Sequence, residues 1–104
     1  MKTIELISGL PGESLVRKGL DDLSAGKRTV CAYLVSIGRR RLAAAGLLSA
    51  ADRSLSEEPE LELYRLLRSE GGDAYSRYNA LLRELVSFEQ ALDRRIRQSS
   101  KASA

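Results

Sequence analysis

The strongest structural signal in the chain is DAYSRYNALLRELVSFEQALDRRIRQ, which spans Asp73–Gln98. Its apolar side chains recur at alternating intervals of four and three residues, the spacing of one face of an α-helix. The main row consists of Ala74, Tyr78, Leu81, Leu85, Phe88 and Leu92, and a second row consists of Tyr75, Leu82 and Ile96. The sequence therefore predicts a helix about 36–39 Å long.

A shorter helix is predicted immediately before this segment. Ser54-Leu55-Ser56-Glu57 has the spacing of a capping box, and the acidic residues that follow suit the positive end of a helix dipole. The adjacent Gly71 and Gly72 end this helix, and Asp73 is placed to cap the next one. The two helices form a predicted hairpin over residues 54–98.

The first half of the chain predicts a second hairpin, over residues 11–46. Its first helix spans about Pro11–Ala25, after a turn that includes Gly9. Its second helix begins at Thr29, a candidate N-cap, and ends at Gly46 in a left-handed conformation. Gly38 lies inside the second helix, where glycine costs about 1 kcal/mol relative to alanine. The helix either bends there or divides into two.

These segments predict an all-α fold, a small bundle of about four helices with a long C-terminal helix. Residues 1–98 are expected to form a single helical domain, because 104 residues is a common size for one domain. Residues 99–104, which are small and polar, are expected to be a disordered tail.

The residue types that are absent argue against catalysis. The chain has no histidine and a single cysteine, Cys31. This composition excludes triads that use histidine, zinc sites that use histidine, and intramolecular disulfides. We therefore expect no enzyme activity, no cofactor and no bound metal.

Cys31 itself has two interpretations. Lys27 and Arg28 lie just upstream and could lower the pKa of its thiol, whereas its apolar neighbours favour a buried, inert side chain. The lone cysteine also agrees with a reducing compartment, and the apolar run near the N-terminus is too short for a signal peptide or a membrane span. We expect a cytoplasmic protein that does not interact with membranes.

The charge pattern suggests one candidate surface. The formal net charge is only +3, but basic residues gather in residues 17–53, and the candidates for contact with a polyanion are Lys27, Arg28, Arg39, Arg40 and Arg41. Three consecutive helical residues spread over about 200° of the helix circumference, so Arg39–Arg41 cannot all face one partner. Contact with nucleic acid is therefore the alternative hypothesis.

The leading hypothesis is a small protein-interaction module, either homo-oligomeric or an accessory or regulatory partner of a larger protein. The predicted C-terminal helix is longer than the helices that could cover it, so Phe88, Leu92 and Ile96 are expected to form an exposed apolar strip. Arg95 is expected to lie at the polar rim of this strip.

Overall fold

The computed structural model of the protein describes residues 6–48 and 57–103. This part of the chain contains helices and no strands, which confirms the all-α prediction. The helices are α2 (Glu13–Ser24), α3 (Val30–Ile37), α4 (Arg39–Ala44), α5 (Pro59–Ser69) and α6 (Ala74–Ser103). The molecule is elongated, with principal extents of 49 × 28 × 18 Å.

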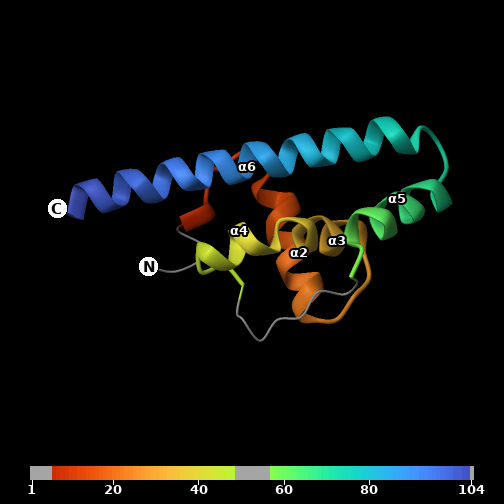
Figure 1. The fold of residues 1–104 in the computed structure, drawn as a ribbon, viewed down its shortest axis with the longest axis horizontal. Helices are drawn as coiled ribbons and strands as arrows, with labels where there is room; N and C mark the ends of the chain where they lie inside the picture. Colours follow the sequence, from red (N-terminus) through yellow and green to blue (C-terminus); the bar gives the residue numbers. More distant parts are fainter. Residues whose placement is uncertain (1–5, 49–56, 104) are drawn as a thin grey trace.

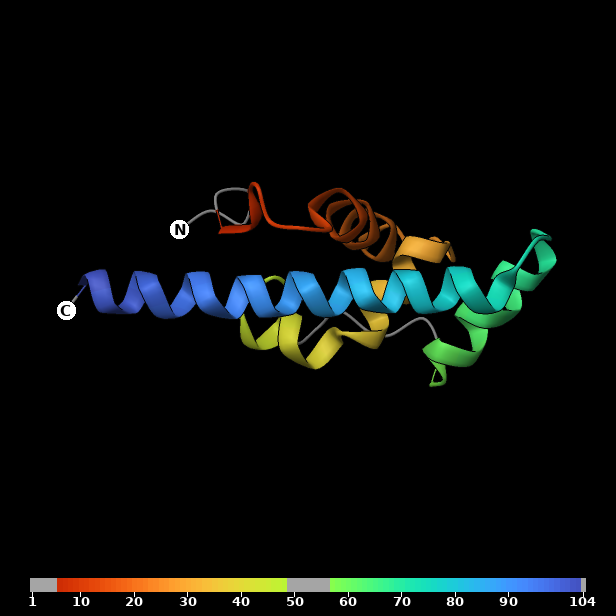
Figure 2. The same cartoon turned by 90° about the horizontal axis from the view of Figure 1, so that it is seen from above.

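Helix α6 runs along the whole molecule and the other helices pack beneath it (Figure 1). Seen from above, α2 lies on one side of α6 and α4 on the other (Figure 2). Helix α3 occupies the centre and contacts α2, α4, α5 and α6. All six residues from Cys31 to Ser36 are buried, as expected for a short helix that is apolar on nearly every side.

Local capping signals place several helix ends where the sequence predicts them. The Thr29 hydroxyl accepts a hydrogen bond from the Ala32 amide at 3.2 Å and so caps α3. The Asp73 carboxylate accepts one from the Ser76 amide at 3.0 Å at the start of α6. Gly46 has a φ of 82°, and the Leu47 amide bonds to the Leu42 carbonyl at 2.9 Å, which is the Schellman pattern.

Gly38 divides the predicted second helix into α3 and α4. A Cβ at this position would lie 2.9 Å from Oε2 of Glu89 and 3.2 Å from Cδ1 of Leu85. Glycine therefore interrupts the helix and also allows α6 to approach closely. This outcome settles whether the segment bends or divides.

The predicted starts of two helices differ from the observed ones, and a proline or a glycine explains each difference. Helix α5 begins at Pro59 rather than near residue 54, because proline suits the first helical position and disfavours helical geometry in the residue before it. The serines of the predicted capping box lie outside the described residues. Helix α2 begins at Glu13 rather than Pro11, because Gly12 adopts a φ of 79°.

The C-terminal boundary is also corrected, since α6 continues through Ser103 instead of ending at Gln98. Residues 99–103 contain no proline or glycine, and each added residue extends an existing ladder of backbone hydrogen bonds at no new nucleation cost. The predicted disordered tail is therefore helical over these five positions.

Candidate interaction surface

The predicted apolar strip at the end of α6 is mostly core. Phe88 is 0% exposed and Leu92 is 3% exposed, so the expectation that these side chains face a partner is wrong. They belong to the same buried cluster as Ile7, Leu42 and Leu48. These residues, from the N-terminal turn and the end of the α4 region, cover α6 further along its length than the predicted helix lengths suggested.

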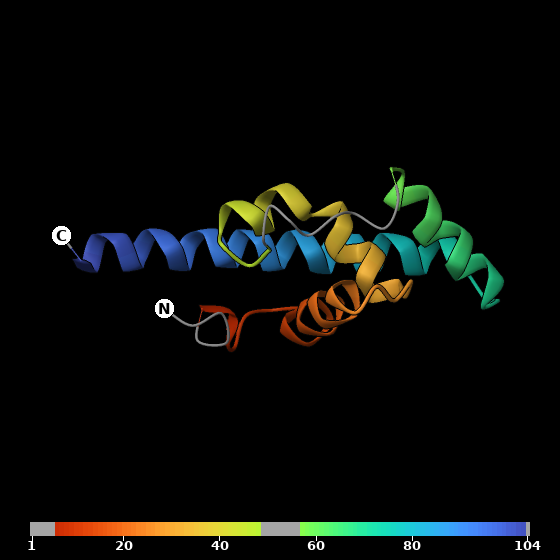
Figure 3. The ribbon, with the colours of Figure 1, turned by 90° about the horizontal axis from the view of Figure 1, so that it is seen from below.

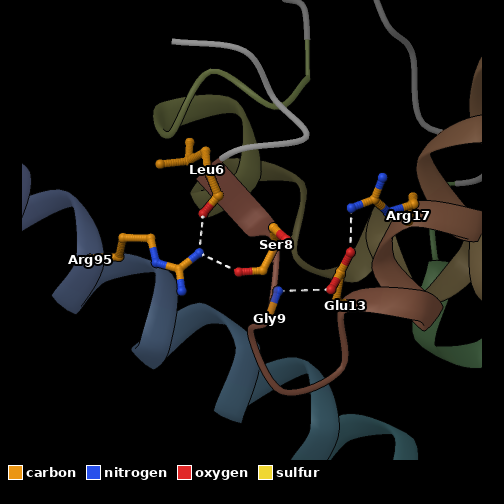
Figure 4. A network of polar contacts seen from close by, with 6 residues as sticks. All are labelled: Leu6, Ser8, Gly9, Glu13, Arg17 and Arg95. Atoms are coloured by element: carbon orange, nitrogen blue, oxygen red, sulfur yellow. Dashed lines mark hydrogen bonds and ion pairs between the residues drawn. The ribbon is translucent and has the colours of Figure 1, made fainter.

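Arg95 does not lie free at the rim of an exposed strip, because its side chain is hydrogen-bonded to the N-terminal turn. We call this pair of hydrogen bonds the Arg95 clamp. Its guanidinium donates hydrogen bonds to the carbonyl oxygens of Leu6 at 3.0 Å and Ser8 at 2.6 Å (Figure 4). Glu13 continues the network by accepting from the Gly9 amide at 2.8 Å and pairing with Arg17. The Gly9 hydrogen bond, helped by Arg17, holds the pKa of Glu13 below its usual value. This network fixes the N-terminal turn against α6.

The predicted polyanion-binding residues are exposed, but they fall into two groups. Arg39, Arg40 and Arg41 lie on α4, whereas Lys27 and Arg28 lie in the connection between α2 and α3. The two groups flank opposite ends of α3, whose eight residues span about 12 Å. The structure therefore does not gather the five side chains at one point.

An exposed apolar face on α6 was missed by the sequence analysis. Tyr75 is 67% exposed and Val86 is 47% exposed, and Leu82 between them is half-buried. These positions lie on one side of the helix, displaced by about 100° from the buried row that contains Leu85 and Leu92. The sequence did contain a signal for this exposed face. The second apolar row, with Tyr75 and Leu82, is displaced around the helix from the main row, and a single buried face of α6 cannot cover both rows equally.

Three open hollows lie along α6, and neighbouring hollows share lining residues. The first is lined by Tyr75, Asn79, Leu82, Arg83, Val86 and Ser87. The second shares Leu82 and Val86 with the first, and adds Ile37 and Gly38 from the junction of α3 and α4. The third shares Arg41 and Glu89 with the second, and is also lined by Ala44, Ala45 and Ile96. We call these three hollows together the α6 groove; α4 lies beside the middle of α6 (Figure 3).

Unpaired arginines border the apolar part of the α6 groove. Arg83 lines the first hollow, and Arg40 and Arg41 line the second. None of the three has an ion-pair partner among residues 6–48 and 57–98. Glu89 also lines the second hollow, and its burial raises the pKa of its carboxyl, although Arg41 acts in the opposite direction.

The single thiol is part of the core. Cys31 is 8% exposed, and burial raises the pKa of its thiol although Lys18 nearby favours the thiolate. The interpretation of Cys31 as an activated thiol is therefore wrong, because loss of hydration outweighs the nearby positive charge.

The described part of the chain holds no cluster of three or more potential metal ligands. Within the same residues, no helix combines the length and the apolar character needed to cross a bilayer.

Comparisons with protein-family models, curated proteins and solved structures find no match for this chain.

Proposed function

We propose that the protein is a non-catalytic interaction module that binds a helical segment of another protein along the α6 groove. The observation that supports this proposal is the exposure of Tyr75 and Val86 on one face of a long helix, beside an open hollow. Exposed apolar side chains that are contiguous and have polar neighbours are typical of protein-binding sites. Tyrosine is also enriched at interfaces, because its ring buries area and its hydroxyl keeps a polar contact.

The supporting scaffold suits this role. Leu85 and Phe88, in the buried row about 100° around α6 from the exposed face, are anchored in the core, so the exposed face is held in one orientation before a partner arrives. Preorganisation of this kind lowers the entropic cost of association. The absence of histidine and the burial of the lone thiol support a role in binding rather than in chemistry. The same lone thiol supports a reducing compartment such as the cytoplasm.

A pair of variants tests the proposal. Val86→Asp places a charge in the groove, whereas Ala80→Asp places the same charge on an exposed position of α6 outside the groove lining. We expect wild-type and Ala80→Asp proteins to retain the same partner from an extract of the native host, and Val86→Asp to lose it. A Val86→Asp protein that remains folded, by circular dichroism, and retains this partner would overturn the proposal.

Contact with a polyanion is the second candidate, and it is favoured by the exposure of Arg39, Arg40 and Arg41, none of which forms an ion pair within the described part of the chain. Non-specific binding to nucleic acid is strongest at low salt. Undetectable binding to duplex DNA and to RNA under those conditions removes this candidate. Binding that is lost in an Arg39, Arg40 and Arg41 triple alanine variant supports it.

A further inference from the structure

We propose that the partner segment is an acidic amphipathic helix, whose apolar face covers Ile37, Leu82 and Val86 and whose carboxylates pair with Arg40, Arg41 and Arg83. This inference rests on the proposed function, and it adds the chemistry of the partner. Its basis is the combination of an apolar floor with a rim of unpaired cations, both found at the same two hollows.

The length of the apolar floor sets the size of the partner. Tyr75 and Val86 are eleven positions apart on α6, which corresponds to about 16 Å, or three helical turns. A helix that lies in such a groove places apolar anchors at i, i+3 or i+4, and i+7. A partner segment of three to four turns therefore spans the exposed face from Tyr75 to the junction of α3 and α4.

The rim sets the charge of the partner. Arginine presents a planar fork of donors that matches a carboxylate, and three such groups surround Leu82 and Val86. The acid that shares the second hollow, Glu89, is half-buried and lies at the α4 side of the groove. A neutral helix in the groove would offer the rim arginines no partners of opposite charge. A helix with glutamates on both sides of its apolar face would pair with these arginines.

Charge also separates this partner from a second copy of the chain. In a two-fold dimer the same patch meets itself, so two copies of a surface that carries three arginines and one glutamate would be brought together and would repel each other. Nucleic acid fits less well because its phosphates would have to cover the apolar floor formed by Ile37, Leu82 and Val86.

Peptide probes test the inference directly. The first probe is a labelled 16-residue helical peptide with leucines at i, i+4 and i+7 and glutamates on both sides of that row. The second has lysine in place of every glutamate, and the third has the composition of the first with the leucines scattered around the helix. We expect fluorescence anisotropy to detect binding of the acidic peptide only.

Charge reversal supplies the specific test. We expect a triple variant, Arg40→Glu, Arg41→Glu and Arg83→Glu, to bind the acidic peptide on the order of tenfold more weakly, since exposed ion pairs contribute modestly each. The same variant should gain affinity for the lysine peptide. Arg94→Glu reverses a charge on an exposed residue of α6 outside the groove lining and serves as the control, which should bind like the wild type. Thermal melting of each variant checks that it is folded.

The outcomes separate this inference from the proposed function. Equal binding of the acidic and lysine peptides, or no effect of charge reversal, overturns the acidic partner while the groove stands as a binding surface. Loss of the acidic peptide on Val86→Asp supports both proposals, and its retention contradicts both. Sedimentation that reveals a wild-type dimer and a Val86→Asp monomer would make a second copy the occupant and overturn the acidic partner. Binding to vesicles that contain phosphatidylserine, abolished by Val86→Asp, would overturn it in favour of a lipid surface.

Discussion

Gly19 of α2 lies directly against the backbone of Cys31 in α3. A Cβ at position 19 would lie 3.0 Å from the carbonyl carbon of Cys31 and 2.6 Å from Cγ1 of Val35. A glycine inside a helix weakens that helix, and the sequence alone offers no compensating reason for it. The reason is tertiary, because the absence of a side chain lets α2 cross the central helix at close range.

Replacement of this glycine should therefore destabilise the protein. Gly19→Ala gains about 1 kcal/mol of helix propensity but forces α2 away from α3, and overpacking costs about 1–3 kcal/mol. We expect a net loss in the free energy of unfolding, measured by urea denaturation. Ser14→Ala, at an exposed position of the same helix, should change this free energy by less than about 0.5 kcal/mol. A Gly19→Ala protein more stable than the wild type would contradict the close contact.

Asp22 should make stability depend on pH in the acid range. Its carboxylate is buried and accepts hydrogen bonds from the Thr29 hydroxyl at 2.6 Å and the Lys18 ammonium at 3.1 Å. The Thr29 bond, followed by that of Lys18, holds the pKa of Asp22 below its ordinary value of 3.8. The stabilisation is therefore present above pH 3.8 and is lost as the pH falls through the lowered pKa.

Melting temperatures measured from neutral pH down to the acid range check this dependence. Asp22→Asn should lower the melting temperature at neutral pH and flatten the decline in acid. Asp21→Asn changes the exposed neighbour and should keep the wild-type profile. An unchanged acid profile in Asp22→Asn would show that other groups carry the dependence.

Loss of the Arg95 clamp should release the N-terminal turn. Arg95→Ala removes two charge-assisted hydrogen bonds, to the carbonyls of Leu6 and Ser8, and hydrogen bonds to charged groups contribute about 1.5–3 kcal/mol each before solvent screening. We expect faster hydrogen exchange at the Leu10 amide, which bonds to the Ile7 carbonyl within that turn. Arg94→Ala removes the same charge from the exposed neighbouring residue and should leave the exchange rate of the Leu10 amide unchanged. This control shows whether the effect of Arg95→Ala comes from the loss of net charge alone.

Truncation of a buried and of an exposed apolar residue on α6 should have different effects on the free energy of unfolding. Leu92→Ala removes a buried side chain and should cost about 2–5 kcal/mol in unfolding free energy. Val86→Ala removes an exposed one and should change stability by less than about 0.5 kcal/mol. Equal losses in urea denaturation would mean that Val86 is covered in solution.

The sequence predicted features that depend on near neighbours. Thr29, Gly46 and Asp73 act on groups within a few residues, so the capping prediction from each is confirmed. The start of α5 also follows from a local signal, because Pro59 favours the first helical position, and α5 begins there rather than at the capping-box pattern.

Features that depend on contacts between distant segments could not be predicted from local sequence signals. The burial of Leu92 requires Ile7 and Leu48 to lie in the same cluster, and nothing in the periodicity of α6 specifies which side each helical row faces. The role of Arg95 requires two carbonyl groups from the beginning of the chain. The exposure of Tyr75 and Val86 follows from the packing of other segments against the buried row of α6, which the sequence of α6 alone does not specify.

The Arg95 clamp also imposes an order on folding during synthesis. Arg95 follows Leu6 by 89 positions, so the ribosome completes the first four described helices before the residue that secures the N-terminal turn is made. Helices α2 and α3 are close in sequence and can pair early, whereas the turn that precedes them reaches its final position only after Arg95 has been made.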